Sequence, residues 1–218
     1  MIRRKISAAP SVRRLPSYLH VIKQVDTEGS EYISGTVIAG ELNLEPIQVR
    51  KDLAITGIIG KPKKGYPAKA LITAIEHFLG WDEIQDAILV GVGNLGSALM
   101  GYPELRSHGL RMVAAFDINP EKIGNPVHGV PVYSVDGMGS TIQDLAVKLA
   151  LLTVPNTEAQ RSADILVGAG ITAIWNFTKV KLKVPDEVIV EKEDISSGYA
   201  ILRVMQQTKK NEKNHGAP

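Results

Sequence analysis

A glycine-rich turn in the middle of the chain constrains the fold more than any other feature. The stretch Ile88-Leu89-Val90-Gly91-Val92-Gly93-Asn94-Leu95-Gly96 is an apolar run that enters a G-x-G-x-x-G turn and leads into a helix-like segment. This is the pattern of the first strand, turn and helix of a dinucleotide-binding sheet. The three glycines permit the tight bend, the approach of a pyrophosphate and close helix–strand packing, in that order. More than 80 residues precede the turn, so the nucleotide site is joined to another domain.

A second apolar strand, Met112–Phe116, ends in Asp117, 21 residues beyond Gly96. An acidic side chain at this position accepts hydrogen bonds from an adenosine ribose and repels the extra phosphate of NADP, so NAD(H) is the expected ligand. Two structural alternatives stay open at this point: a turn chosen only for close packing, and an aspartate that merely caps its strand.

The later apolar segments predict a single doubly wound parallel sheet. Pro155 stops one of the strands at its carboxyl end, on the side where open sheets bind ligands. The expected strands and helices after Asp117 are 130–133, 141–145 (helix), 149–154, 157–167 (helix), 173–177 and 188–190.

The front of the chain is basic. Residues 1–80 carry 12 Lys and Arg against 7 Asp and Glu (+5), whereas residues 81–218 carry 13 against 16 (−3). This asymmetry favours a polyanionic partner for the front domain. We expect a loose basic arm over 1–14, a helix that begins at Pro16, and a boundary near Gly80.

Two short helices follow, the first capped by Ser34 and ending at Leu42, the second opened by Pro46. A connection of about three residues between such helices is typical of a helix-turn-helix, whose second helix lies in the major groove. Its early side chains Gln48, Arg50 and Lys51 suit base edges. The Gly/Pro turn after it resembles the wing of a winged helix that contacts phosphates, through Lys61, Lys63, Lys64 and Tyr66. A helix pair that never touches DNA, with a merely solvated lysine turn, is the structural alternative.

An enzyme is less well supported. From Gly91 to the end there are 128 residues, which a dinucleotide-binding sheet nearly fills, leaving no room for a substrate domain. The alternatives kept are a small NAD-dependent oxidoreductase with an accessory basic domain, and a scaffold that binds CoA or another adenine nucleotide. The chain has no cysteine and no apolar run of 18 residues, so we expect no disulfide, no metal site, no membrane and a cytoplasmic location.

The chain resembles the Rex family of bacterial redox-sensing transcriptional repressors over nearly its whole length. The stretches that carry the resemblance are Arg14–Leu19, Val49–Leu53, Gly60–Lys61 with Gly65–Tyr66, Gly91–Gly96, Val113–Asp117, Thr153–Pro155, Ala169–Ile171 and Asn176–Phe177. The resemblance implies an α/β homodimer with an N-terminal winged helix-turn-helix domain (1–80) and a C-terminal Rossmann domain (81–193). It also implies a last segment (194–218) that consists of a helix swapped onto the partner, Asp194 to about Gln207, and a disordered tail.

The resemblance further implies a non-enzymatic repressor that senses the NADH/NAD⁺ ratio and loses operator DNA when NADH binds. An uncharged pocket favours neutral NADH, because desolvation penalises the cationic oxidised ring. The expected dinucleotide contacts are Gly91, Val92, Gly93, Asn94, Leu95, Gly96, Asp117, Ile118, Thr153, Val154, Pro155, Gly170 and Ile171. The expected DNA contacts are Arg14, Tyr18, Pro46, Gln48, Arg50, Lys51, Lys61, Lys63, Lys64 and Tyr66.

The chain departs from the family pattern at three places. The family's switch involves an Asp, a Tyr and an Arg; Asp194 and Tyr102 match, but His20 stands at the Arg position. Ser97 follows the glycine turn where an Arg is common, and Ala54-Ile55-Thr56 replaces Ser-Tyr-Phe. A neutral His pairs more weakly than Arg with a carboxylate, so we expect a weaker or altered response to NADH.

Overall fold

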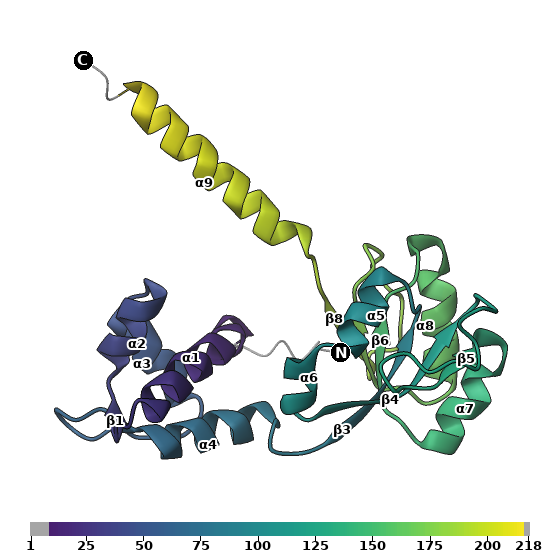
Figure 1. The fold of residues 1–218 in the computed structure, drawn as a ribbon, viewed down its shortest axis with the longest axis horizontal. Helices are drawn as coiled ribbons and strands as arrows, with labels where there is room; N and C mark the ends of the chain where they lie inside the picture. Colours follow the sequence, from purple (N-terminus) through teal and green to yellow (C-terminus); the bar gives the residue numbers. More distant parts are fainter. Residues whose placement is uncertain (1–8, 216–218) are drawn as a thin grey trace. The chain divides into compact units, whose positions relative to one another are not determined.

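The computed structural model describes the backbone of residues 9–215 and the side chains of residues 9–211. The chain forms two compact units (Figure 1). The first comprises residues up to Ile84 together with Glu104–Leu110, and the second comprises Gln85–Pro103 and the residues from Arg111 onward. The division therefore falls four residues beyond Gly80, and a short later segment rejoins the front unit.

The front unit is a helical domain with a two-stranded sheet. Its helices are α1 (Ala9–Thr27), α2 (Gly35–Leu42), α3 (Pro46–Ala54) and α4 (Ala68–Leu79). Strand β1 (Tyr32–Ile33) pairs antiparallel with β2 (Tyr66–Pro67). The Ser34 hydroxyl accepts a hydrogen bond from Val37 N–H and caps α2, as predicted. The core contains buried side chains from all four helices, including Leu15, Ile38, Leu53 and Leu71.

The first helix begins earlier than expected. Helix α1 starts at Ala9, so Pro16 lies inside it and the loose arm is wrong for residues 9–14; residues 1–8 lie outside the described part. A proline inside a helix removes one backbone hydrogen bond. Pro16 is exposed, whereas its neighbour Leu15 is fully buried. The packing of that face holds the helix together across the proline.

The segment Glu104–Leu110, which contains α6 (Pro103–Ser107) except for its first residue, belongs to the front unit by its contacts. The His108 ring stacks on Trp81 with the centroids 3.6 Å apart and the planes 8° from parallel. Burial lowers the pKa of His108, so the stacked ring is neutral near pH 7. The domain bounds expected from the sequence put this segment in the Rossmann domain instead.

The back unit is built on a six-stranded sheet. Its strands are β3 (Gln85–Val90), β4 (Leu110–Asp117), β5 (Val132–Ser134), β6 (Leu149–Leu152), β7 (Ala173–Asn176) and β8 (Ile189–Lys192). The order across the sheet is β5-β4-β3-β6-β7-β8, and the pairings β3–β6, β4–β5, β6–β7 and β7–β8 are parallel. This is the doubly wound Rossmann order, in which the strand sequence reverses between β3 and β6. The predicted fold class is confirmed.

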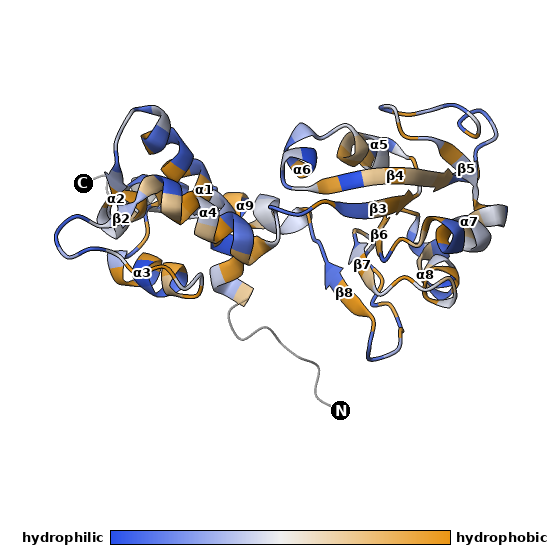
Figure 2. Ribbon diagram, turned by 90° about the horizontal axis from the view of Figure 1, so that it is seen from below, coloured by the Kyte–Doolittle hydropathy of each residue, from blue (hydrophilic) through white to orange (hydrophobic). Residues whose placement is uncertain are grey.

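Helices cover the two faces of this sheet unequally. Helix α5 (Asn94–Met100) lies on one side, and α7 (Met138–Leu145) and α8 (Ala159–Gly168) lie on the other (Figure 2). Strands β3, β4 and β6 carry the most continuously buried residues, as parallel strands do when both faces are covered. Toward β7 and β8 the side chains of Leu149, Ala173, Trp175 and Ile189 instead line a shallow apolar depression.

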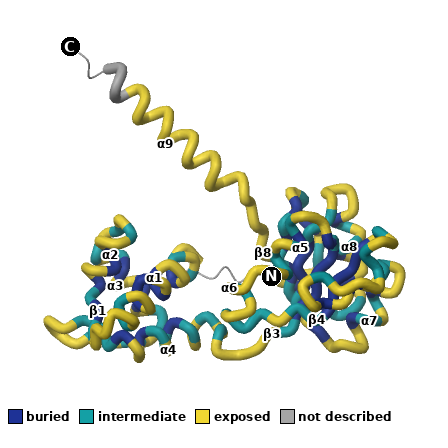
Figure 3. The backbone as a smooth tube through the Cα atoms, viewed as in Figure 1, coloured by how far each residue is buried: buried dark blue, intermediate teal, exposed yellow. Residues whose placement is uncertain are grey.

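The last helix is longer than expected. Helix α9 runs from Ser196 to His215, so the predicted disorder after Gln207 is wrong for the residues up to 215; residues 216–218 lie outside the described part. The stretch from Thr208 to His215 contains no Gly or Pro, and its lysines and glutamate are good helix formers. Every α9 side chain up to Asn211 is exposed, as Figure 3 shows.

Candidate nucleic-acid interface and dinucleotide site

The outer face of α3 is basic. Arg50, Lys51, Ile47 and Ala54 are exposed at helical spacing, whereas Val49, Asp52 and Leu53 are buried against the domain. A Cβ atom on Gly35 would lie 3.2 Å from Arg50 Cγ, so the stem of Arg50 packs against the start of α2. Pro46, partly buried, opens α3 and presents no charged or polar side chain. This face matches what a recognition helix offers to base edges.

The predicted wing is a tight turn between α3 and β2. Gly65 N–H donates to Lys61 O at 3.0 Å, and Lys63 has a φ of +62° directly after Pro62, as in a type II turn. All three lysines are exposed. Lys61 Nζ lies 3.0 Å from Tyr32 Oη, and the ammonium groups of Lys61 and Lys64 each lie 5.4 Å from the Tyr32 ring centroid. Tyr66 is half-buried, with its ring beneath Gly60.

Tyr18, an expected DNA contact, lies inside the domain and presents no exposed side-chain surface. Its side chain is fully buried, and its hydroxyl donates a 2.6 Å hydrogen bond to Asp52 Oδ2. Arg14 reaches the same carboxylate through Nε at 2.7 Å and Nη2 at 2.9 Å. Asp52 is 3% exposed, and the Arg14 hydrogen bonds hold its pKa below the usual range even though burial opposes this. These three side chains join α1 to α3 inside the domain.

The glycines of the dinucleotide turn differ in what surrounds them. Gly91 has a φ of +96°, and a Cβ on Gly96 would lie 2.2 Å from Gly91 O. Both positions therefore require glycine for the fold itself. Gly93 is exposed, and a Cβ there would meet no atom within 4 Å. The chain alone does not explain a glycine at Gly93, whereas a pyrophosphate lying against the backbone does.

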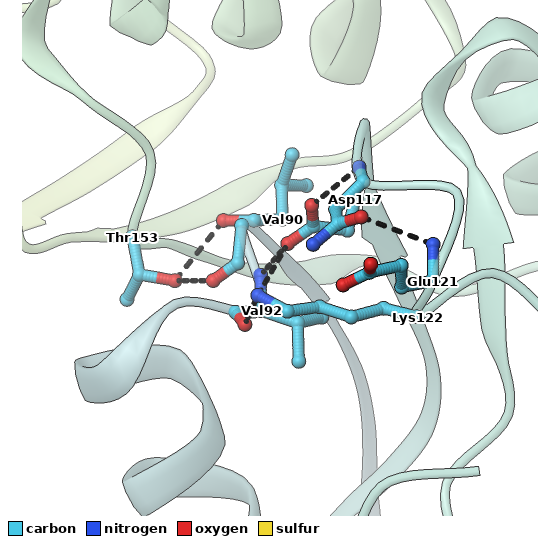
Figure 4. Close-up of polar contacts among 8 residues, drawn as sticks. Val90, Val92, Asp117, Glu121, Lys122 and Thr153 are labelled. Atoms are coloured by element: carbon cyan, nitrogen blue, oxygen red, sulfur yellow. Dashed lines mark hydrogen bonds and ion pairs between the residues drawn. The ribbon is translucent and has the colours of Figure 1, made fainter. Parts of the chain in front are cut away.

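Thr153, at the carboxyl end of β6, is hydrogen-bonded to the glycine turn that begins at Gly91 (Figure 4). Its hydroxyl lies 2.7 Å from Gly91 O and 3.0 Å from Val90 O, and its N–H donates to Val90 O. These contacts bridge the two strands between which the order reverses, which is where Rossmann sheets bind ligands.

Asp117, the expected ribose contact, is the last residue of β4. Its carboxylate accepts hydrogen bonds from Val92 N–H at 2.7 Å and Asn119 N–H at 2.8 Å, and it is 9% exposed. Lys122 Nζ lies 3.7 Å from this carboxylate and 2.5 Å from Val92 O (Figure 4). Lys122 was not among the expected site residues, because a lone lysine in a polar loop carries no sequence signal.

The remaining expected dinucleotide contacts lie at two different edges of the sheet. At the carboxyl edge, Asn94 and Leu95 are the first residues of α5, and Val154 and Pro155 lie in the turn after β6. Ile118 follows Asp117 with its side chain 77% exposed. Gly170 and Ile171 do not join them. They precede β7, whose first residue, Ala173, pairs with the first residue of β6, so they lie at the amino edge of the sheet.

Two further observations confirm that Gly170 and Ile171 belong to the scaffold. Lys148 Nζ donates to Gly170 O at 3.2 Å, and Ile171 is buried in the core. The residues that do follow β7 at the carboxyl edge are Phe177 and Thr178; Phe177 N–H donates to Leu152 O, and the buried Asn176 side chain holds Thr178. The sequence pattern gave no strand register, so it could not distinguish the two edges.

The three residues expected to form the switch lie on separate segments. His20 is exposed on α1, and Tyr102 is half-exposed between α5 and α6. Asp194 accepts hydrogen bonds from the N–H and hydroxyl of Ser196 at the start of α9, which lower its pKa. In α5, Ser97 Oγ lies 3.4 Å from His128 Nε2.

Comparison with known proteins identifies both halves. Residues 5–54 match the family described as putative DNA-binding protein N-terminus, and residues 82–180 match the CoA binding domain family. The chain is 58% identical over 210 residues to the redox-sensing transcriptional repressor Rex of Treponema denticola, covering 96% of this chain and all of that one. It belongs to the Rex family. The Rex of Bacteroides thetaiotaomicron is 40% identical, covering 90% of this chain and 88% of that one.

Solved Rex-family structures share the whole fold. A structure of RSP, a Rex-family repressor, has a TM-score of 0.87 at 29% identity, with 98% of this chain and 100% of that chain covered. RSP in complex with NADH has a TM-score of 0.86 at 30% identity (97% and 99% covered), and RSP in complex with NAD⁺ and operator DNA one of 0.85 at 31% (98% and 100%). The Rex relatives are named redox-sensing transcriptional repressors, in agreement with the expected regulator.

Two classes of site find no support in the described residues. Over residues 9–215, no helix is both long and apolar enough to span a membrane. Within the same part of the chain, no cluster of three or more histidine, aspartate or glutamate side chains is arranged to bind a metal ion.

Proposed function

We propose that this chain is a homodimeric repressor that binds operator DNA through α3 and the wing, and that releases the DNA when NADH binds at the Gly91 turn. The observation that carries the proposal is the pairing, in one chain, of an exposed basic α3 face with an open Gly93 at a Rossmann switch point. The structures of RSP with NADH and with NAD⁺ and operator DNA support both ligands. Such a repressor works in the cytoplasm, where bacterial DNA lies.

On the DNA side, the chain supplies two kinds of contact. Arg50, Lys51 and Gln48 read base edges, and the exposed Ile47 adds an apolar contact suited to a thymine methyl group. Lys61, Lys63 and Lys64 neutralise phosphates. Lys61 and Lys64 both approach the Tyr32 ring, which orders the wing before DNA arrives.

On the nucleotide side, backbone N–H groups at the start of α5 face the pyrophosphate across Gly93. Asp117 accepts the ribose hydroxyls, and its negative charge disfavours a 2′-phosphate, so NAD(H) is preferred to NADP(H). Ile118 offers an apolar side chain beside the adenine. Val154 and Pro155 supply uncharged surroundings that favour the neutral reduced ring over the cation.

The dimer is supported by two unpaired apolar surfaces. On α9, Tyr199, Leu202 and Met205 are 54–66% exposed at spacings of three, with Ile195, Ile201 and Val204 beside them. In the back unit, Leu149, Ala173, Trp175 and Ile189 line an uncovered part of the sheet. Apolar surface of this extent points to a protein interface. A second copy of the chain, with α9 exchanged, would cover both.

The switch is proposed to involve His20, Tyr102 and Asp194. A ligand shifts a dimer between two states only by its differential affinity for them. Because His20 stands where the family has an arginine, its pairing with Asp194 is weaker, and a smaller response to NADH is expected.

The deciding experiment measures operator affinity by fluorescence anisotropy across NADH concentrations. Arg50→Ala should abolish operator binding and leave NADH affinity unchanged. Gly93→Glu should do the reverse, because a carboxylate would occupy the place of the pyrophosphate. A wild-type protein that binds no double-stranded DNA, or that turns over a substrate with NADH, would favour the oxidoreductase alternative. Calorimetry with NADH, NAD⁺, NADP⁺ and CoA tests the ligand class.

A further inference from the structure

The side chain of Gln48, on α3, lies beside that of Arg14, on α1. One atom of the Gln48 amide end is 3.3 Å from Arg14 Nη1 and also 3.3 Å from Nη2. Both guanidinium nitrogens are obligate donors, so the atom that faces them is the amide oxygen. The amide NH₂ group of Gln48 is therefore directed away from Arg14.

Arg14 is itself fixed by a buried carboxylate. Asp52 accepts both Nε and Nη2 of Arg14, and Tyr18 Oη donates to the same group from within the core. The bidentate geometry leaves the guanidinium plane little freedom. The pKa of Arg14 is raised chiefly by its hydrogen bond to Asp52, so the pair is ionic at all relevant pH values.

We propose that Arg14 is a positioning residue that holds Gln48 as a pure hydrogen-bond donor toward the operator. A glutamine that pairs with adenine uses its oxygen and its nitrogen together, accepting from N6 and donating to N7. With the oxygen occupied by Arg14, Gln48 recognises a base acceptor: a purine N7, guanine O6 or thymine O4. Adenine is not selected through its amino group at this position. This inference rests on the proposed function, because it presupposes that α3 reads DNA.

The ion pair between Arg14 and Asp52 also affects how binding depends on salt. Its charge is compensated by Asp52 at 2.7 Å, so Arg14 contributes little to the release of counterions from DNA phosphates. The wing lysine Lys63 has no such carboxylate partner among the described ion pairs. The two residues should therefore affect the salt dependence of binding differently.

The test is an analogue scan of an operator selected in vitro with the wild-type protein. Each purine and thymine is replaced in turn by an analogue that lacks an acceptor: 7-deazaadenine, 7-deazaguanine, 2-aminopurine for guanine, or 5-methyl-2-pyrimidinone for thymine. Each adenine is also replaced by purine, which lacks the 6-amino donor. The base read by Gln48 is the one whose analogue penalty disappears in Gln48→Ala.

We expect an acceptor-deleted analogue at that base to weaken binding roughly fivefold to tenfold, and the loss of an amino group there to have no effect. Equal penalties for both analogues at one adenine would show bidentate pairing and overturn the proposal. A Gln48→Ala variant that changes no analogue penalty would overturn it as well. Both outcomes require a wild-type protein that binds its operator, so they are distinct from failure of the proposed function.

Arg14→Lys tests the positioning step. Lysine keeps the positive charge but lacks the two guanidinium nitrogens that hold the Gln48 amide oxygen. Arg14→Lys should therefore lower operator affinity by about the same factor as Gln48→Ala. In the double variant the two effects should not add. The logarithmic salt slope should stay unchanged, whereas Lys63→Ala should reduce it by about 1. A purely structural role of Arg14 would lower operator and non-specific affinity equally and would refute the proposal.

Discussion

The Thr153 hydroxyl lies 2.7 Å from the carbonyl oxygen of Gly91, across the point where the strand order of the sheet reverses. The turn that would admit a pyrophosphate is thus bonded to the loop that would border the nicotinamide. The same hydroxyl also lies 3.0 Å from Val90 O, so the Thr153 side chain connects the loop after β6 to the end of β3 and the glycine turn.

Thr153→Val should weaken this connection without changing side-chain size. We expect a loss of about 1 kcal/mol in the free energy of unfolding and a several-fold loss in NADH affinity, since a half-buried acceptor loses its partner. Thermal unfolding and calorimetry measure the two effects. Thr172→Val is the matched control, because its hydroxyl makes only an exposed 3.5 Å contact to Lys148 O. Similar effects of the two substitutions would contradict the assignment.

Alanine substitutions should separate two glycines of the turn. Gly96→Ala places a Cβ 2.2 Å from Gly91 O, so the helix must shift, and we expect destabilisation of about 1–3 kcal/mol. Gly93→Ala meets no protein atom and should leave thermal stability unchanged while lowering NADH affinity. If Gly93→Ala bound NADH as tightly as the wild type, the pyrophosphate would have to lie elsewhere.

The buried Tyr18 predicts an alkaline limit to the stability of the front unit. Burial, followed by the hydrogen bond to Asp52, raises the pKa of Tyr18 to about 12 from 10.0. Between these values the unfolded chain loses the phenolic proton first, so stability is intact below pH 10 and falls as the pH rises through 12. Denaturant unfolding at increasing pH should show this decline, and Tyr18→Phe should reduce it. An identical slope in both proteins would be evidence against burial of the hydroxyl.

The apolar side of α9 predicts that the dimer depends on this helix. Leu202→Asp places a charge on a 54% exposed apolar position, and it should convert the dimer to monomers in sedimentation experiments. Gln207→Asp, on the polar face of the same helix, provides the matched control and should remain dimeric. Unchanged mass for Leu202→Asp would exclude this surface.

The parts of the fold with periodic apolar patterns were predictable. The glycine fingerprint, the strand that ends at Asp117 and the Ser34 cap each depend on residues close in sequence, and the structure shows them where they were expected. The edge of the sheet to which Gly170 belongs depends on register, which arises from the pairing of β6 with β7. Likewise Tyr18 was expected to be a DNA contact, but its burial follows from the packing of α1 on α3, which the sequence does not show.

The return of Glu104–Leu110 to the front unit bears on how this gene can be divided. A fragment that stops at Ile84 would keep Trp81 but lose His108, leaving one face of the indole in water. A fragment that starts at Gln85 would carry α6 without the surface on which it rests. The DNA-binding half is therefore an interrupted domain, and a linear cut between the halves would damage both products.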